Sequence, residues 1–355
     1  MSRGGAILAS LLVTIGRPAW WLVALTGFLV RGGFVVFVLP IVLLPSPLAI
    51  SNVLAPVIVP VALGRIGPDA IGIFLGTVTL LSGWIIVGGW IAAATDLTLI
   101  RESDAAAIEE GIGSPAAEAR AANKSTATAS VSSAVAVPAI PIGDRVLIGR
   151  MLAARLIAWL PLAFATGLGL VSLIAVTYTE LTRPFEVDTP IVVRVVLGAA
   201  PELAIIALTW LFGELVGGLA ARRMVLGGAS TGAALIAAIG DVIRRPIGTI
   251  LSWLVTTGIL LAVLVATVAA ASVAWSRVIA ALSDGSVDPV TIALDLLLFV
   301  AIWLAALVLT GLFAAIRGSI QTFEYIRLRS PTGTFGASAH NRPGDWSIPD
   351  EGGSL

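Results

Sequence analysis

Residues 289–316 read PVTIALDLLLFVAIWLAALVLTGLFAAI and contain one charged side chain, that of Asp295. A bilayer core about 30 Å thick is crossed by about 20 apolar helical residues, because lipid offers no hydrogen-bond partner to a free backbone amide or carbonyl. The stretch is long enough for one spanning helix and far longer than the roughly 10-residue strands of a membrane β-barrel. It therefore predicts an all-α membrane protein.

Five further stretches have the same apolar character. They cover approximately residues 20–44, 70–94, 156–176, 197–220 and 247–275. Because each of them is also long enough to cross a bilayer as a helix, we predict a polytopic helical bundle of six transmembrane helices. Their succession along the chain predicts three helical hairpins.

The overall composition agrees with a membrane environment. Charged residues make up 12% of the 355 residues and hydrophobic residues 58%, with a mean hydropathy of +1.03. Soluble domains carry about 25% charged residues. The formal net charge is zero and Lys and Arg form no run, which argues against a nucleic-acid partner because phosphate backbones require a concentrated basic surface.

Several kinds of chemistry lack the side chains that they need. The chain has no Cys, and its only Lys and only His are Lys124 and His340, both outside the apolar stretches. A phosphate-binding Walker A loop needs its Lys, and haem or zinc sites in the membrane need imidazole or thiolate ligands. We therefore expect no cofactor, no metal site and no intrinsic catalysis.

The distribution of cations predicts the orientation. Loops rich in Lys and Arg tend to stay in the cytoplasm, and with the N-terminus inside, sixteen of the 21 cations fall on the cytoplasmic side. The other five are Arg31, within the first span, and four on the external side: Arg65, Arg183, Arg194 and Arg277. The pattern predicts a multi-pass plasma-membrane protein with both termini cytoplasmic.

Three segments before the outward-going spans predict amphipathic helices at the cytoplasmic surface. In residues 3–17, the polar side chains fall on one side at helical spacing and the leucines on the other. Residues 235–243 repeat the apolar pattern of such a helix. Residues 144–155 interrupt an apolar segment with charges, and their polar face is less regular.

The remaining segments are polar or broken. Residues 102–142, rich in Ala, Ser and Thr, predict a disordered cytoplasmic linker, and residues 330–355 predict a disordered cytoplasmic tail, since neither can bury much apolar area. The linker separates residues 1–101, with the first interfacial helix and hairpin, from residues 143–329, with the other two hairpins. Prolines break the apolar segment 45–68, which is either re-entrant or interfacial.

Ionisable side chains within the spans are the candidate site. Each costs about 2.5–3.5 kcal/mol to place in the membrane on insertion scales, so such residues are functional candidates by default. Arg31 lies near the middle of the first span, and four carboxylates lie closer to span ends: Asp96, Glu202, Glu214 and Asp295.

Counting residues along straight helices leaves Glu214, Glu202 and Asp295 all within reach of an extended Arg31, and we predict Glu214 as its partner because of the neighbouring glycines. Gly213, Gly217 and Gly218 beside Glu214 would let another helix approach closely. Three interpretations are open: a buried ion pair that holds the bundle in register, a path for a substrate or ion, or side chains that reach to an interface.

These features favour a function in membrane transport, either as a small permease or as the membrane subunit of a transporter complex. The surface helices would then offer a cytoplasmic protein partner a docking site. A membrane scaffold or assembly factor is the alternative, with the linker and tail as interaction elements. An intramembrane enzyme is the minority alternative, because no closely spaced pair of carboxylates is apparent.

Overall fold

The computed structural model describes residues 3–38, 40–41, 67–109, 142–182, 191–244, 246–283 and 288–329, and all regular elements within them are helices. The predicted tail, the segment 42–66 and most of the predicted linker lie outside the described residues. The long helices are α5 (Pro68–Glu109), α7 (Ile142–Thr182), α9 (Ala200–Gly227), α11 (Pro246–Ser283) and α12 (Pro289–Arg329).

Among the described residues, six helices are long and apolar enough to cross a membrane, which agrees with the six predicted spans. They are Pro18–Val38, Ile71–Glu109, Gly143–Glu180, Ala200–Gly227, Trp253–Ser283 and Pro289–Arg327. Large apolar side chains lie exposed along them, among them Leu80, Phe164 and Leu297 at 75%, 71% and 65% exposure. Such surfaces imply contact with lipid, because water would not support so much exposed apolar area.

The first span is a broken helix. It consists of α2 (Pro18–Phe28), the π-helical turn η1 (Leu29–Gly33) and α3 (Phe34–Val38). Gly32 has a φ of 102°, which side chains other than glycine rarely adopt. A Cβ on Gly33 would lie 2.2 Å from the Phe28 ring. The two glycines therefore allow the chain to turn sharply inside the span.

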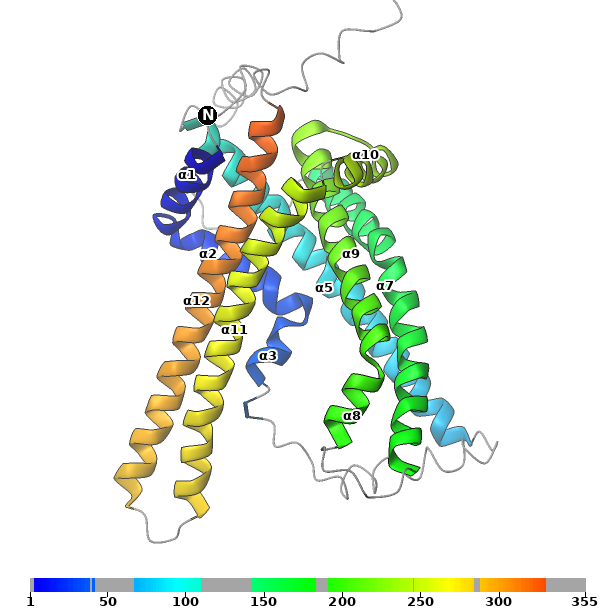
Figure 1. Cartoon of the computed structure of the whole chain (residues 1–355). Coiled ribbons are helices and arrows are strands. Elements are labelled where there is room, and N and C mark those ends of the chain that lie inside the picture. Colours follow the sequence, from blue (N-terminus) through cyan, green and yellow to red (C-terminus); the bar gives the residue numbers. More distant parts are fainter. Residues whose placement is uncertain are drawn as a thin grey trace, which may run out of the picture.

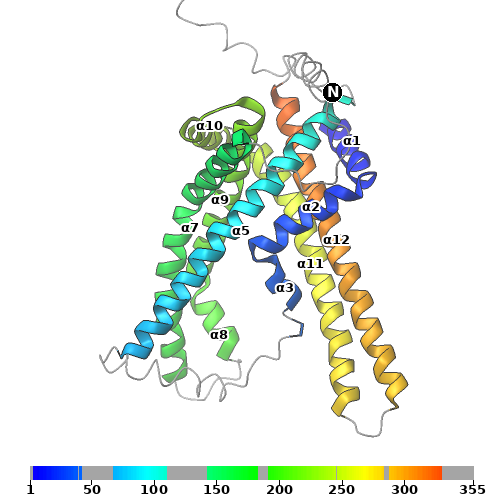
Figure 2. The same cartoon turned by 180° about the vertical axis from the view of Figure 1, so that it is seen from behind.

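Two pairs of helices frame the bundle (Figures 1 and 2). Helix α11 packs along α12, and α7 packs along α9, which follows the short helix α8 (Ile191–Gly198). The pairs lie close at the end that carries α1 and α10 and diverge toward the α8 end, and α5 crosses between them. In a first hairpin, α2 would pack mainly on α5, but it packs more extensively on α12. The three-hairpin arrangement therefore stays a prediction.

Helix α1 (Arg3–Ile15) forms as a separate element, but its polar side does not face water. Ser10 and Thr14 are fully buried, and the hydroxyl of Ser10 donates to that of Ser319 on α12 at 3.0 Å. Leu8 and Leu12 are exposed instead. The polar stripe read from the sequence is thus a helix-packing surface, and the position of α1 in a membrane interface stays a prediction.

The other two predicted surface helices have different outcomes. Helix α10 (Thr231–Arg244) is a separate element, after a turn at Gly228, whose φ of 65° ends α9. Residues 144–155 are not separate, because α7 continues from Ile142 through the whole span. Helix α5 likewise runs to Glu109, so residues 102–109 of the predicted linker are helical. Polar residues continue both helices beyond the apolar stretch because helical hydrogen bonding does not require an apolar sequence.

Candidate functional site

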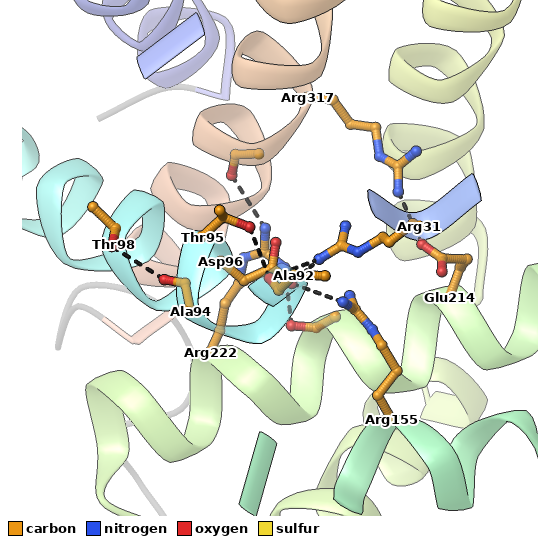
Figure 3. Close-up of polar contacts among 12 residues, drawn as sticks. Arg31, Ala92, Ala94, Thr95, Asp96, Thr98, Arg155, Glu214, Arg222 and Arg317 are labelled. Atoms are coloured by element: carbon orange, nitrogen blue, oxygen red, sulfur yellow. Dashed lines mark hydrogen bonds and ion pairs between the residues drawn. The ribbon is translucent and has the colours of Figure 1, made fainter. Parts of the chain in front are cut away.

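The break in the first span places Arg31 against α5. Its Nη2 forms an ion pair with Asp96 Oδ2 and also donates to the backbone oxygen of Ala92 at 3.3 Å. The same carboxylate oxygen accepts from Nη1 of Arg155 on α7 at 2.8 Å. Figure 3 shows both guanidinium groups directed at Asp96. One carboxylate therefore links η1, α5 and α7.

A second ion pair joins the two halves of the bundle. Arg317 Nη2 on α12 donates to Glu214 Oε2 on α9 at 3.0 Å, and Glu214 is 8% exposed (Figure 3). The Arg317 guanidinium also lies over the Trp253 ring of α11, 5.5 Å from its centroid, a favourable cation–π distance. These contacts connect α9 with the α11–α12 pair.

Arg222 is the most buried of the arginines here, at 6% exposure. Its guanidinium donates to Thr322 Oγ1 at 3.2 Å, to the Gly218 backbone oxygen at 2.9 Å and to the Gly318 backbone oxygen at 3.1 Å. All three acceptors are neutral, and no carboxylate among the described residues forms an ion pair with Arg222. Its charge is therefore solvated by α9 and α12 without a counter-charge in direct contact.

These charged groups surround one cavity of about 230 Å³. Its lining comes from α2, η1, α5, α7, α9, α11 and α12 and includes four arginines and two carboxylates: Arg31, Arg155, Arg222, Arg317, Asp96 and Glu214. Arginine is charged at any pH at which proteins are folded. With both carboxylates ionised, the described residues of the lining carry two excess positive charges.

Small residues allow the helices to approach closely beside the cavity. A Cβ on Gly27 of α2 would lie 2.6 Å from Thr95 Oγ1 of α5, and one on Gly213 of α9 would lie 2.7 Å from the ring of Trp159 on α7. Close backbone approach at small residues is common in membrane bundles. The glycines predicted to allow close approach beside Glu214 therefore include one helix contact, at Gly213.

The structure brings together three of the five predicted site residues, Arg31, Asp96 and Glu214. The other two lie outside the cavity. Glu202 accepts a hydrogen bond from Ser172 Oγ at 2.8 Å, and Asp295 lies 3.5 Å from Arg277, whose side chain is 63% exposed.

The predicted pairing of Arg31 with Glu214 is wrong as a direct contact, because Arg31 pairs with Asp96 and Glu214 pairs with Arg317. The prediction assumed straight helices that end with their apolar stretches. The first span is broken instead, and α5 continues beyond the predicted end of the second span. Glu214 still interacts electrostatically with Arg31 across the cavity.

Sequence reasoning missed Arg155, Arg222 and Arg317, which it counted among the cytoplasmic cations. One signal was present for Arg222: Glu214, Gly218 and Arg222 recur at four-residue spacing, which places them on one helix face. A charged face that also carries a glycine is typical of a buried surface between membrane helices. Arg155 and Arg317 lie at the polar ends of apolar stretches. At such positions, sequence alone does not show whether a side chain points into the bundle or toward the membrane surface.

The described residues contain no group of three or more His, Cys, Asp or Glu side chains positioned to hold a metal ion. Fold and site together define a multi-pass helical membrane protein with a charged internal cavity. Comparisons with protein-family models, with curated proteins and with solved structures gave no match.

Proposed function

We propose that the protein takes part in membrane transport, as a small permease or as the membrane subunit of a transporter complex, and that its solute binds in the charged cavity. The observation that carries this proposal is the position of the cavity at a break in a spanning helix. Transporters commonly build substrate sites from discontinuous helices, and ionisable groups inside spans mark substrate and ion paths.

We further propose that the chain has no catalytic activity of its own. Each carboxylate in the cavity is held by arginine, Asp96 by two and Glu214 by one. Acid–base catalysis by paired carboxylates instead requires two that share a proton at close range. A membrane scaffold is the alternative function; capture of one defined partner through residues 102–141, with no solute flux, would support it.

Solute flux tests the transport proposal. Proteoliposomes should swell in a stopped-flow light-scattering assay with at least one solute of a panel containing glycerol, choline chloride and sodium phosphate, relative to protein-free liposomes. Each salt is tested with an ionophore that lets its counter-ion cross, because swelling requires net entry of both ions. Ala314→Trp fills the cavity and should return the rate to background, whereas Ala305→Trp, on an exposed face of the same helix, should not. No flux of any solute would contradict a permease function of the isolated chain, and equal flux in Ala314→Trp would show that the solute does not pass through the cavity.

Cysteine labelling tests the proposed orientation in the plasma membrane. The chain has no Cys, so each introduced thiol is the only one. We expect Thr189→Cys and Ser286→Cys to react with a membrane-impermeant maleimide in intact cells. Ser125→Cys and Ser338→Cys should react only after lysis, because we place the linker and tail in the cytoplasm. The reverse pattern would overturn the orientation.

A further inference from the structure

We propose that the cavity binds a phosphate-type oxyanion, carried either by a free solute or by the headgroup of an anionic lipid. This inference deepens the proposed function by naming the chemical class of the ligand, and it rests on that function for the choice of cavity. Three observations support it: the excess of positive charge, the unpartnered N–H groups of the lining, and the size of the cavity.

The excess charge is the first observation. Four arginines and two carboxylates line the cavity, and the acceptors that hydrogen-bond to Arg222 are all neutral. Positive charge inside a membrane bundle is costly unless a counter-charge accompanies it. A phosphate dianion would balance the two excess charges of the described lining, whereas a cation would increase the imbalance.

The hydrogen-bonding groups of the lining are the second observation. Arg31, Trp159 and Gln321 all line the cavity, and each has a buried side-chain nitrogen with no hydrogen-bond partner among the described residues: Nε of Arg31, Nε1 of Trp159 and Nε2 of Gln321. All three are N–H donors, and a buried donor without a partner is unfavourable. A phosphate dianion offers acceptors on three of its four oxygens, so small rotations of these side chains toward the cavity would give the donors partners.

Size and arginine geometry are the third observation. A cavity of about 230 Å³ is below the roughly 300–1,000 Å³ of sites for drug-sized ligands. It suits a small anion or a single headgroup better than a large organic molecule. Arginine is also the side chain whose planar donors best match the oxygens of phosphate, and here four arginines come from η1, α7, α9 and α12.

Binding of ³³P-labelled inorganic phosphate to the purified full-length chain tests the proposal. The protein is delipidated in dodecyl maltoside, which contains no phosphate, and binding is measured by equilibrium dialysis together with the apparent Tm. We expect saturable binding and a higher Tm with phosphate, because a ligand that binds only the folded state stabilises it.

Gln321→Glu is the decisive variant, because it keeps the size of the side chain but replaces an N–H donor by a negative charge. We expect it to weaken phosphate binding by about tenfold or more and to raise the Tm without phosphate. Gln321→Met, which removes the donor without adding charge, should weaken binding less. Arg277→Gln, outside the cavity, should leave the affinity unchanged. If Gln321→Glu does not fold, Arg222→Gln should give the same loss of affinity.

Addition of phosphatidylglycerol distinguishes the two sources of the anion. If it displaces labelled phosphate from the wild-type chain and phosphatidylcholine does not, the ligand is a lipid headgroup; if neither displaces phosphate, the ligand is a free solute. The proposal fails if the wild-type chain neither binds phosphate nor is stabilised by phosphatidylglycerol. It also fails if Gln321→Glu and Arg222→Gln bind phosphate as the wild type does.

The binding measurement tests the anion site and the flux measurement tests transport, so either proposal can fail without the other. Phosphate binding without flux of any solute would leave the anion site in place and remove the permease function of the isolated chain. Flux of glycerol or choline that Ala314→Trp blocks, in a protein that binds neither phosphate nor phosphatidylglycerol, would keep transport and remove the anion site.

Discussion

Replacement of Asp96 by Asn is expected to destabilise the protein by about 3–5 kcal/mol, the usual cost of removing one partner from a buried ion pair. Asp96 is the only carboxylate in contact with Arg31 and Arg155 among the described residues, and the three side chains are 16–24% exposed. Its loss leaves two guanidinium groups unpaired and raises the excess charge of the cavity from two to three. Reversible unfolding in mixed micelles measures the change in free energy.

Two comparisons show whether this cost comes from the shared carboxylate. Arg31→Gln should cost less than Asp96→Asn, because Arg155 still donates to the same oxygen of Asp96. Asp295→Asn should cost at most about 1 kcal/mol, since its partner Arg277 is largely exposed. Equal losses at Asp96 and Asp295 would contradict the role of Asp96 as the central acceptor.

The pair of Glu214 and Arg317 should show the second large effect. Glu214→Gln leaves Arg317 without its carboxylate, and Arg317→Gln leaves Glu214 buried without its arginine, so each single substitution should cost about 3–5 kcal/mol. The double variant should recover much of that loss, because it removes both charges. A double-mutant cycle measures the coupling, and additive losses would show that the pair does not stabilise the bundle.

Glu214→Gln is also expected to change stability and phosphate affinity in opposite directions. It raises the excess positive charge of the cavity from two to three, so phosphate should bind more tightly to this variant although the protein unfolds more easily. A merely structural role for Glu214 would lower stability without strengthening the affinity for phosphate. Phosphate titration of Glu214→Gln at a temperature where it remains folded makes this comparison.

The span pattern was predictable because length and hydropathy are local properties. Residues 289–316 and the five other apolar stretches each satisfy the requirement for a spanning helix without reference to the rest of the chain, and each overlaps one of the six candidate spans among the described residues. Helix ends were less predictable. Polar residues extend α5 to Glu109 and α7 back to Ile142, because helical hydrogen bonding continues past the apolar segment.

The site was predictable only in part. A charged residue in an apolar run stands out in any sequence, which is why Arg31 and Glu214 were found. Arg155, Arg222 and Arg317 were assigned to the cytoplasmic side because cations near span ends usually lie at an interface. Three of the sixteen cations that support the predicted orientation therefore line the cavity, which makes the labelling experiment the proper test of that orientation.

The sequence alone determined that the chain is a helical membrane protein and predicted six spans, because the length and hydropathy of each apolar stretch can be judged without the rest of the chain. Only the tertiary structure decided which charges meet. The break at Gly32, the continuation of α5 past Asp96 and the packing of α9 near α12 bring charged residues from five elements to one cavity. Ion pairing depends on a few ångströms between helices distant in the chain, and hydropathy contains no information about those distances.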